Sequence, residues 1–250
     1  MPTLTDTRLI LHASLDEPVR DLAPVHAWLC DVDDAQQLAG VDEAAVSADE
    51  LQRANRLIDA EKRCRFLRCR AVVRSVLGRL LGVPPRAVEF AVNAHGKPCV
   101  VMPCACGSTP LPQLQVNWSH SANLLLLAVT VSGELGVDVE VVNADVDALA
   151  VAQSHFTRME LNALRTQSGT ERTENFHRVW TVKEAVLKAL GTGLSVAANR
   201  VSVAWSNVTD TPVVTLDDAP LTGSPQWRFH TLSLTKESQP AFAAIALRLT

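Results

Sequence analysis

The chain has 250 residues, of which 47% are hydrophobic and 20% are charged, so it can bury a core without disulfides or structural metals. Its net charge of −4 argues against general nucleic-acid binding, which needs a basic surface. The longest apolar run, Leu124 to Val131, is far too short to cross a bilayer and predicts a buried strand.

The N-terminal residues 1–20 lack a basic start followed by an apolar segment, which is the pattern of a secretory signal. We therefore expect a cytoplasmic protein that has no membrane partner. Six cysteines are present, at positions 30, 64, 69, 99, 104 and 106. The last three cluster, but they lack paired C-x-x-C spacing and no histidine follows closely, so reduced thiols are favoured over a zinc site.

The first half of the chain predicts two helices and then strands. A helix over 47–58 begins at Ser47, a good N-cap with acidic residues behind it, and a longer helix over 60–82 ends at Gly82. Strands are expected at 88–92 and 98–102, with a Pro- and Gly-rich surface loop at 103–113. Basic residues crowd this helical region, and we interpret most of them as a solvated helix face.

The second half repeats the mixture of strands and helices. Strands are expected at 124–132 and 135–142, joined by a hairpin turn at Ser132–Glu134. The remaining expected elements are helices at 145–153, 157–167 and 172–190, and strands at 201–205, 212–216, 226–234 and 241–249. Both halves mix the two element types, which indicates two α/β lobes with a seam near residue 133.

An acidic pair lies in the predicted strand Gly136–Val141. Alternate side chains of a strand share a face, so its three valines would point into a core while Asp138 and Glu140 project together from the other side. These two carboxylates repel each other unless a cation lies between them, and hard oxygen ligands of this kind suit Mg²⁺. A half-exposed edge strand with ordinary acidic residues is the alternative, which the motif alone favours.

The predicted helix that ends at Leu190 carries a further acidic group. Its apolar stripe is Val179, Val182, Val186 and Leu190, and a neighbouring face carries His177, Thr181, Glu184 and Lys188. Glu184 and Lys188 are one helical turn apart, so the plain alternative is a surface ion pair, which typically stabilises a helix by ~0.2–0.5 kcal/mol. Gly191 is expected to close the helix.

A third polar segment, Ser119-His120-Ser121, lies just before the buried strand. Its hydroxyl and imidazole groups can donate hydrogen bonds to phosphate oxygens. A hydrolytic triad is disfavoured, because adjacent serine and histidine side chains in a strand point to opposite faces and no nucleophile elbow is present. An ordinary strand histidine is the alternative.

In order and spacing, these segments resemble the phosphopantetheinyl transferases of the larger, single-chain type that activate nonribosomal peptide synthetases. That family carries a Gly-Lys-Pro element, a Ser-His-Ser element, a Gly-x-Asp-x-Glu strand and a Trp-x-x-Lys-Glu-(x)₃-Lys helix. In this chain the elements are Gly96–Pro98, Ser119–Ser121, Gly136–Glu140 and Trp180–Lys188. The match extends weakly to the arginine-rich helix and to Phe156–Glu160. Four such elements in one order are highly specific.

The resemblance implies a mixed α/β (α+β) fold of two similar lobes related by a pseudo-twofold axis, each a small sheet packed with helices. The lobes would be residues 1–133 and 134–250, with coenzyme A in the cleft between them. Because both lobes belong to one chain, a monomer is expected.

The resemblance also implies an activity. The enzyme would transfer the 4′-phosphopantetheine arm of coenzyme A to a serine of an apo acyl or peptidyl carrier protein and release 3′,5′-ADP. Asp138, Glu140 and Glu184 would hold Mg²⁺ against the pyrophosphate of coenzyme A. Glu184 would accept the serine proton, and Lys188 would orient Glu184 or stabilise the phosphate.

The implied contacts with coenzyme A are Arg53, Arg65, Lys97, Pro98, Ser119, His120, Asp138 and Lys188. Where some relatives carry a lysine near Arg53, this chain has Glu50, a departure that bears on how the 3′-phosphate is bound. Two other functions compete with the transferase. One is a catalytically silent module that binds coenzyme A or carrier proteins, and the other is a metal-dependent phosphohydrolase, which would want further carboxylates or histidines for a second metal.

Overall fold

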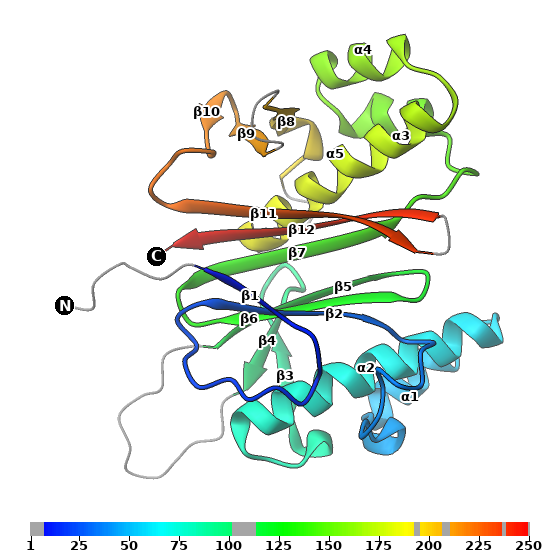
Figure 1. The fold of residues 1–250 in the computed structure, drawn as a ribbon, viewed down its shortest axis with the longest axis vertical. Coiled ribbons are helices and arrows are strands. Elements are labelled where there is room, and N and C mark those ends of the chain that lie inside the picture. The colour runs from blue at the N-terminus through cyan, green and yellow to red at the C-terminus, as the bar shows by residue number, and fades with distance from the viewer. Residues whose placement is uncertain (1–7, 102–113, 193–195, 207–210, 237–238, 250) are drawn as a thin grey trace. The chain divides into compact units, whose positions relative to one another are not determined.

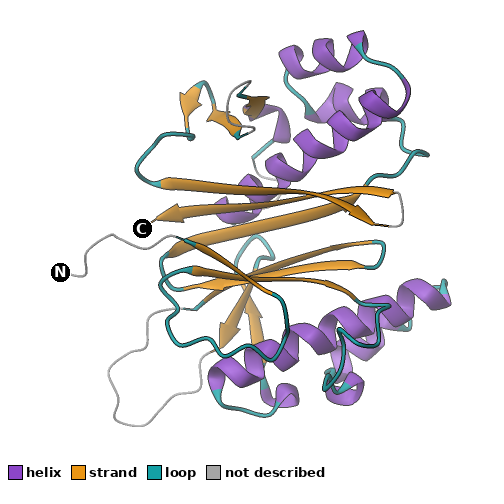
Figure 2. Ribbon diagram, in the orientation of Figure 1, coloured by secondary structure: helices purple, strands orange, loops and turns teal. Residues whose placement is uncertain are grey.

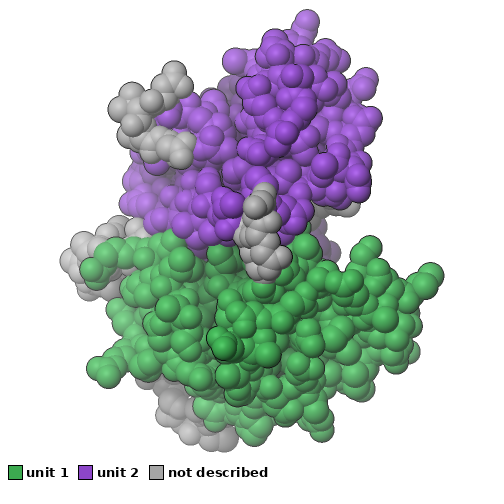
Figure 3. All heavy atoms as spheres, turned by 45° about the vertical axis from the view of Figure 1, so that its right-hand side comes forward, with its two compact units in different colours: residues 1–92, 98–131 green, residues 93–97, 132–250 purple. Residues whose placement is uncertain are grey.

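The computed structural model of the chain describes residues 8–101, 114–192, 196–206, 211–236 and 239–249 (Figure 1). The chain divides into two compact units (Figure 3). Unit 1 comprises residues 1–92 and 98–131, and unit 2 comprises residues 93–97 and 132–250. No helix among the described residues is long and apolar enough to cross a membrane.

Unit 1 is built on a four-stranded sheet in the order β1-β2-β6-β5. The strands are β1 (Leu9–His12), β2 (Val25–Asp31), β5 (Gln115–Ser121) and β6 (Leu124–Thr130). β1 runs parallel to β2, and the other pairs are antiparallel. A separate hairpin pairs β3 (Glu89–Val92) with β4 (Pro98–Val101).

The 22-residue helix α2 (Ala60–Leu81) packs on this sheet, and the short helix α1 (Ala48–Ala54) packs against α2. The 3-10 turns η1 (Glu43–Ala45) and η2 (Pro85–Ala87) also contact α2. Ser47 caps α1 in a capping box with Glu50, and α2 ends at Gly82 in the left-handed conformation. The buried face of α2 packs on β2 and β6 through residues such as Val73 and Leu77.

Unit 2 contains the three-stranded antiparallel sheet β11-β12-β7 (Figure 2). Its strands are β7 (Gly133–Val141), β11 (Trp227–Lys236) and β12 (Gln239–Leu249). A smaller sheet joins β8 (Val201–Trp205), β9 (Pro212–Leu216) and β10 (Ala219–Pro220). The helices are α3 (Ala148–His155), α4 (Arg158–Thr166) and α5 (Gly169–Leu190), with a 3-10 turn η4 (Ala198–Arg200).

The two units share an order of elements. In each, a strand precedes the helices and later pairs with a hairpin, which gives β2-β6-β5 in unit 1 and β7-β12-β11 in unit 2. In each, a short helix with a capping box precedes a 22-residue helix that ends at a left-handed glycine, Gly82 or Gly191. Each unit therefore combines small sheets with helices, and the predicted mixed α/β class is confirmed.

The hairpin predicted at Ser132–Glu134 is wrong. β6 pairs with β2 and β5, whereas β7 pairs with β12, so the two strands belong to different sheets. Gly133 instead begins β7 opposite Leu249, where a Cβ atom would lie 2.2 Å from the carbonyl oxygen of Arg248. The glycine therefore serves a close approach of two strands, which a sequence pattern cannot distinguish from a turn.

Candidate active site

Asp138 is a buried carboxylate in the middle of β7, with 2% of its surface exposed. It lies opposite Ala244 of β12, on the sheet face that packs against α5. Its Oδ1 atom accepts a hydrogen bond from Nζ of Lys188 on α5 at 2.6 Å, so the burial of this charge is compensated by an ion pair.

Gly136 explains how α5 comes so close to β7 (Figure 1). A Cβ atom at this position would lie 2.0 Å from the carbonyl oxygen of Ala185 and 2.2 Å from the amide nitrogen of Ala189. The helix backbone therefore lies directly on the strand, which only glycine permits. Since Gly136 and Asp138 are two residues apart on a strand, they share a face. The close approach thus brings the last turns of α5 onto Asp138.

Glu184 lies one turn before Lys188 on α5. Burial raises the pKa of its carboxyl group, and the negative charge of Asp138 raises the pKa further, whereas Lys188 and His155 lower it. Glu184 therefore has a higher affinity for a proton than an exposed glutamate, which is the property required of a general base that operates near neutral pH.

His155, at the end of α3, is a nearby group that the sequence did not reveal. Its Nδ1 donates a hydrogen bond to the carbonyl oxygen of Val151 at 3.0 Å, and its ring contacts Trp180 edge-on at 5.5 Å. Trp180 precedes Glu184 by one helical turn, and the charge of His155 acts on Glu184. No spacing rule connects residue 155 with residue 184, because the two helices meet only in the folded unit.

The donor set of Asp138 and Glu184 fits a hard divalent cation. Both groups are carboxylates largely withdrawn from water, and their mutual repulsion favours a positive charge between them. Glu140 is half-buried and shares the strand face of Asp138. Among the described residues, no group of three or more His, Cys, Asp or Glu side chains is arranged to hold a metal ion. The magnesium site of Asp138, Glu140 and Glu184 stays a prediction.

Lys97 belongs to unit 2, in the turn 93–97 that rests on the C-terminal end of α5. Its Nζ donates to the carbonyl oxygen of Ala189 at 3.2 Å, and the side-chain amide of Asn93 donates to the carbonyl oxygen of Gly191 at 3.0 Å. Burial lowers the pKa of Lys97, and the charge of Glu134 opposes this shift. A helix C-terminus attracts a cation, so the end of α5 holds this lysine.

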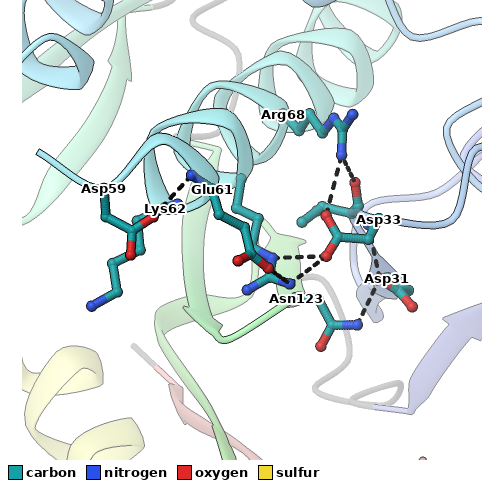
Figure 4. Close-up of polar contacts among 9 residues, drawn as sticks. Asp31, Asp33, Asp59, Glu61, Lys62, Arg68 and Asn123 are labelled. Atoms are coloured by element: carbon teal, nitrogen blue, oxygen red, sulfur yellow. Dashed lines mark hydrogen bonds and ion pairs between the residues drawn. The ribbon is translucent and has the colours of Figure 1, made fainter. Parts of the chain in front are cut away.

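The predicted coenzyme A contacts in unit 1 begin with Arg65 on α2. Arg65 donates a hydrogen bond from Nε to Asp33 at 2.7 Å and forms ion pairs with Asp33 and Glu61, while Arg68 binds Asp33 at 3.1 Å (Figure 4). Hydrogen bonding to Asp33 raises the pKa of Arg65. Arg53 is exposed on α1. Arg65 is thus held in an acidic cluster, and its contact with coenzyme A stays a prediction.

The other predicted contacts in unit 1 lie on strands. In β5, Ser119 is opposite Leu126 and His120 is opposite Leu125, so the two side chains point to opposite faces, as the sequence predicted. His120 is exposed and Ser119 is half-buried. Pro98 begins β4. The predicted loop 103–113, with Cys104 and Cys106, lies outside the described residues.

Comparisons with known proteins place the chain among phosphopantetheine-transferring enzymes. The sequence profile described as the 4′-phosphopantetheinyl transferase superfamily matches residues 134–244. The chain is 37% identical over 171 residues to the 4′-phosphopantetheinyl transferase HetI of Nostoc sp., covering 68% of this chain and 70% of the relative. It is 28% identical over 158 residues to the 4′-phosphopantetheinyl transferase Sfp of Bacillus subtilis, covering 63% of this chain and 66% of that one.

Among solved structures, the holo-(acyl-carrier-protein) synthase of Bacillus anthracis covers 48% of this chain and 98% of its own length, with a TM-score of 0.38 and 20% sequence identity.

Proposed function

Because the chain belongs to the 4′-phosphopantetheinyl transferases, which move the phosphopantetheine arm of coenzyme A onto a carrier protein, we propose that Asp138, Glu184 and Lys188 of unit 2 form its transfer centre. The observation that carries this proposal is that Glu184 and Lys188 of α5 both interact with the buried carboxylate of Asp138 in β7. Asp138 binds Lys188 at 2.6 Å and acts electrostatically on Glu184, although the strand and the helix are about 50 residues apart.

In the proposed reaction, Glu184 accepts the proton of the carrier serine, directly or through one water molecule. The serine oxygen forms a bond to the β-phosphorus of coenzyme A, and the bond from this phosphorus to the bridging oxygen of the pyrophosphate breaks. The electron pair stays on that oxygen, and 3′,5′-ADP leaves. General-base assistance of this kind is worth ~10²–10⁴ in rate.

The magnesium ion would be held by Asp138, by Glu184, and by Glu140, which lies two residues beyond Asp138 on the same face of β7. When bound, the ion would neutralise charge on the pyrophosphate oxygens of coenzyme A. Lys188 would also neutralise negative charge on the pyrophosphate oxygens. Its ammonium group lies against Asp138, from where it would donate a hydrogen bond to a phosphate oxygen. The chain would thus hold the reacting phosphate by charge and position, which dominate phosphoryl transfer.

The carrier is proposed to be an acyl or a peptidyl carrier protein, and the enzyme is proposed to act as a cytoplasmic monomer. The contacts assigned to Arg53, Arg65, Lys97, Pro98, Ser119 and His120 stay predictions. The burial of Lys97 at the end of α5, in the same unit as Asp138 and Lys188, supports its part in them.

The proposal is tested by incubating apo carrier protein with coenzyme A and Mg²⁺ and weighing the carrier. Wild-type enzyme should add one phosphopantetheine, whereas Asp138→Ala and Glu184→Gln should lose most of this transfer. Near-normal transfer by either variant would remove that residue from the mechanism. An unchanged carrier with wild-type enzyme that still binds coenzyme A would indicate a silent binding module, and cleaved coenzyme A without carrier labelling would indicate a hydrolase.

A further inference from the structure

Lys183, the residue that precedes Glu184, is a completely buried lysine with 0% of its surface exposed. Its Nζ lies 2.8 Å from Oε2 of Glu160 and donates to the carbonyl oxygens of Ala198, at 3.1 Å, and Val201. An ammonium group has three N–H donors, so every donor of this lysine has an acceptor. A buried charge satisfied in this way is fixed in place.

Glu160 makes the other half of this arrangement. Its Oε2 accepts a hydrogen bond from the backbone N–H of Thr157 at 2.7 Å, within the capping box that begins α4. Its Oε1 accepts from the backbone N–H of Val203 in β8, also at 2.7 Å. The pair of Glu160 and Lys183 therefore ties together the start of α4, the start of β8 and the middle of α5.

Such a pair is a costly way to stabilise a core. A buried ion pair replaced by apolar side chains of similar volume is often neutral or stabilising, because the desolvation of both charges is avoided. What the pair does supply is a fixed position. Consecutive residues of a helix point about 100° apart, so holding Lys183 fixes the rotation of α5 about its axis and with it the direction of Glu184. Gly136 in turn sets how closely α5 approaches β7.

We propose that Glu160 and Lys183 are positioning residues for the transfer reaction, which hold α5 in the rotation that directs Glu184 and Lys188 toward Asp138. This inference rests on the proposed function, since it needs Glu184 to take part in transfer. Reacting groups must be held within about 10–20° of their productive orientation, so a small rotation of α5 would slow the reaction without unfolding the unit.

Unit 1 contains a matched arrangement that lacks the acid. Arg74 is the fifteenth residue of the 22-residue helix α2, as Lys183 is the fifteenth residue of the 22-residue α5. Arg74 binds Glu50 at 2.7 Å, and Glu50 closes the capping box of α1 as Glu160 closes that of α4. The residue after Arg74 is Ser75, where α5 has Glu184. The same structural device thus occurs once beside the proposed base and once without it.

The test compares turnover with stability in the full-length enzyme. Lys183→Met removes the ammonium group and leaves the Glu160 carboxylate buried, so both the melting temperature and kcat should fall. The double variant Glu160→Gln/Lys183→Met removes both charges and should recover part of the melting temperature. We expect kcat of the double variant to stay at least about tenfold below wild type, with KM for coenzyme A changed by less than about twofold, because misplacement rather than lost binding slows the step.

Arg74→Met is the matched control, because Glu50 keeps its ion pair with Arg70. It should lower the melting temperature while kcat stays within about twofold of wild type. If Lys183→Met does not fold, the isosteric Glu160→Gln carries the same expectation for kcat and KM. A kcat that recovers together with the melting temperature in the double variant, or an equal loss of kcat in Arg74→Met, would show a purely structural role and overturn the proposal. If Glu184→Gln loses turnover and the Lys183 variants do not, the positioning role alone is refuted. Full turnover in Glu184→Gln would instead remove Glu184 from the proposed transfer centre.

Discussion

A single methyl group added at Gly136 should move Glu184 and Lys188 of α5 away from Asp138 of β7, without changing any of these three side chains. In Gly136→Ala the new Cβ atom would lie 2.0 Å from the carbonyl oxygen of Ala185, whereas contacts under 3.0 Å essentially never occur. The neighbouring atoms are backbone, so they cannot turn aside. α5 must therefore withdraw from β7 by at least about 1 Å, the difference between these two distances.

This displacement acts directly on the contacts of Asp138. The ion pair with Lys188 at 2.6 Å would lengthen, and Glu184 would move away on the same helix. A displacement of 1 Å in an active site can cost about 10²-fold in rate, and overpacking of a core typically costs about 1–3 kcal/mol. For a chain of this size, 1 kcal/mol lowers the melting temperature by about 2–4 °C. We therefore expect a folded protein with kcat reduced by about two orders of magnitude.

The assay is carrier labelling under saturating coenzyme A and Mg²⁺, with the melting temperature measured in parallel. Gly78→Ala in α2 is the steric control, because its Cβ atom would lie 2.8 Å from the backbone carbonyl oxygen of Val83, within unit 1. It should reduce stability but leave kcat near wild type. Wild-type kcat in Gly136→Ala would refute the claim that the approach of α5 to β7 sets the geometry of transfer.

Three further predictions concern charge. Glu184→Gln should lower kcat by about 10²–10⁴. It should nevertheless raise the melting temperature of the metal-free protein at neutral pH, because burial and the repulsion from Asp138, which both raise the pKa of Glu184, no longer act on a negative charge there; a destabilised variant would contradict this. Burial lowers the pKa of His26, whose Nδ1 lies 2.8 Å from Nε2 of His12. As pH falls below 6.5, the usual pKa of histidine, the unfolded chain therefore binds a proton at His26 before the folded protein does, and the free energy of unfolding should decrease. The melting temperature should fall less on acidification in His26→Gln than in wild type, and identical pH profiles of the two proteins would refute this. Arg65→Met should raise KM for coenzyme A while kcat stays near wild type, as steady-state kinetics would show, and an unchanged KM would exclude Arg65 from binding.

Local signals accounted for the helices. Ser47 and Gly82 bracket two helices as predicted, because capping hydroxyls and left-handed glycines act within a few residues of the helix end. The later helices were also placed to within three residues at each end, including the start of α5 at Gly169. Strand pairing was less accessible: β1 and β2 were not predicted, and the hairpin at Ser132–Glu134 was wrong because β7 pairs with the last strand of the chain.

In the candidate site, too, local sequence patterns indicated individual residues but not the contacts between distant parts of the chain. Strand alternation and helical spacing singled out Asp138, Glu140, Glu184 and Lys188 as candidates, since each motif is local, but only the resemblance to the transferase family assigned them a role. That Lys188 pairs with Asp138 depends on the close packing at Gly136, and that His155 acts on Glu184 depends on the contact between α3 and α5. These contacts join residues far apart in the sequence, so no spacing rule could predict them. The deep burial of Lys183 likewise followed from no pattern, because a lysine next to a glutamate on a helix usually faces water.

Direct measurement of metal binding tests the central claim, that carboxylates of β7 and α5 hold one divalent ion. Mn²⁺, which takes the same oxygen ligands as Mg²⁺, can be titrated into the full-length enzyme with coenzyme A and followed by electron paramagnetic resonance. One bound ion per chain is expected for wild type, with affinity reduced at least about tenfold in Asp138→Ala and in Glu184→Gln and little changed in the surface control Glu171→Gln. Equal affinity in all four proteins would contradict the account.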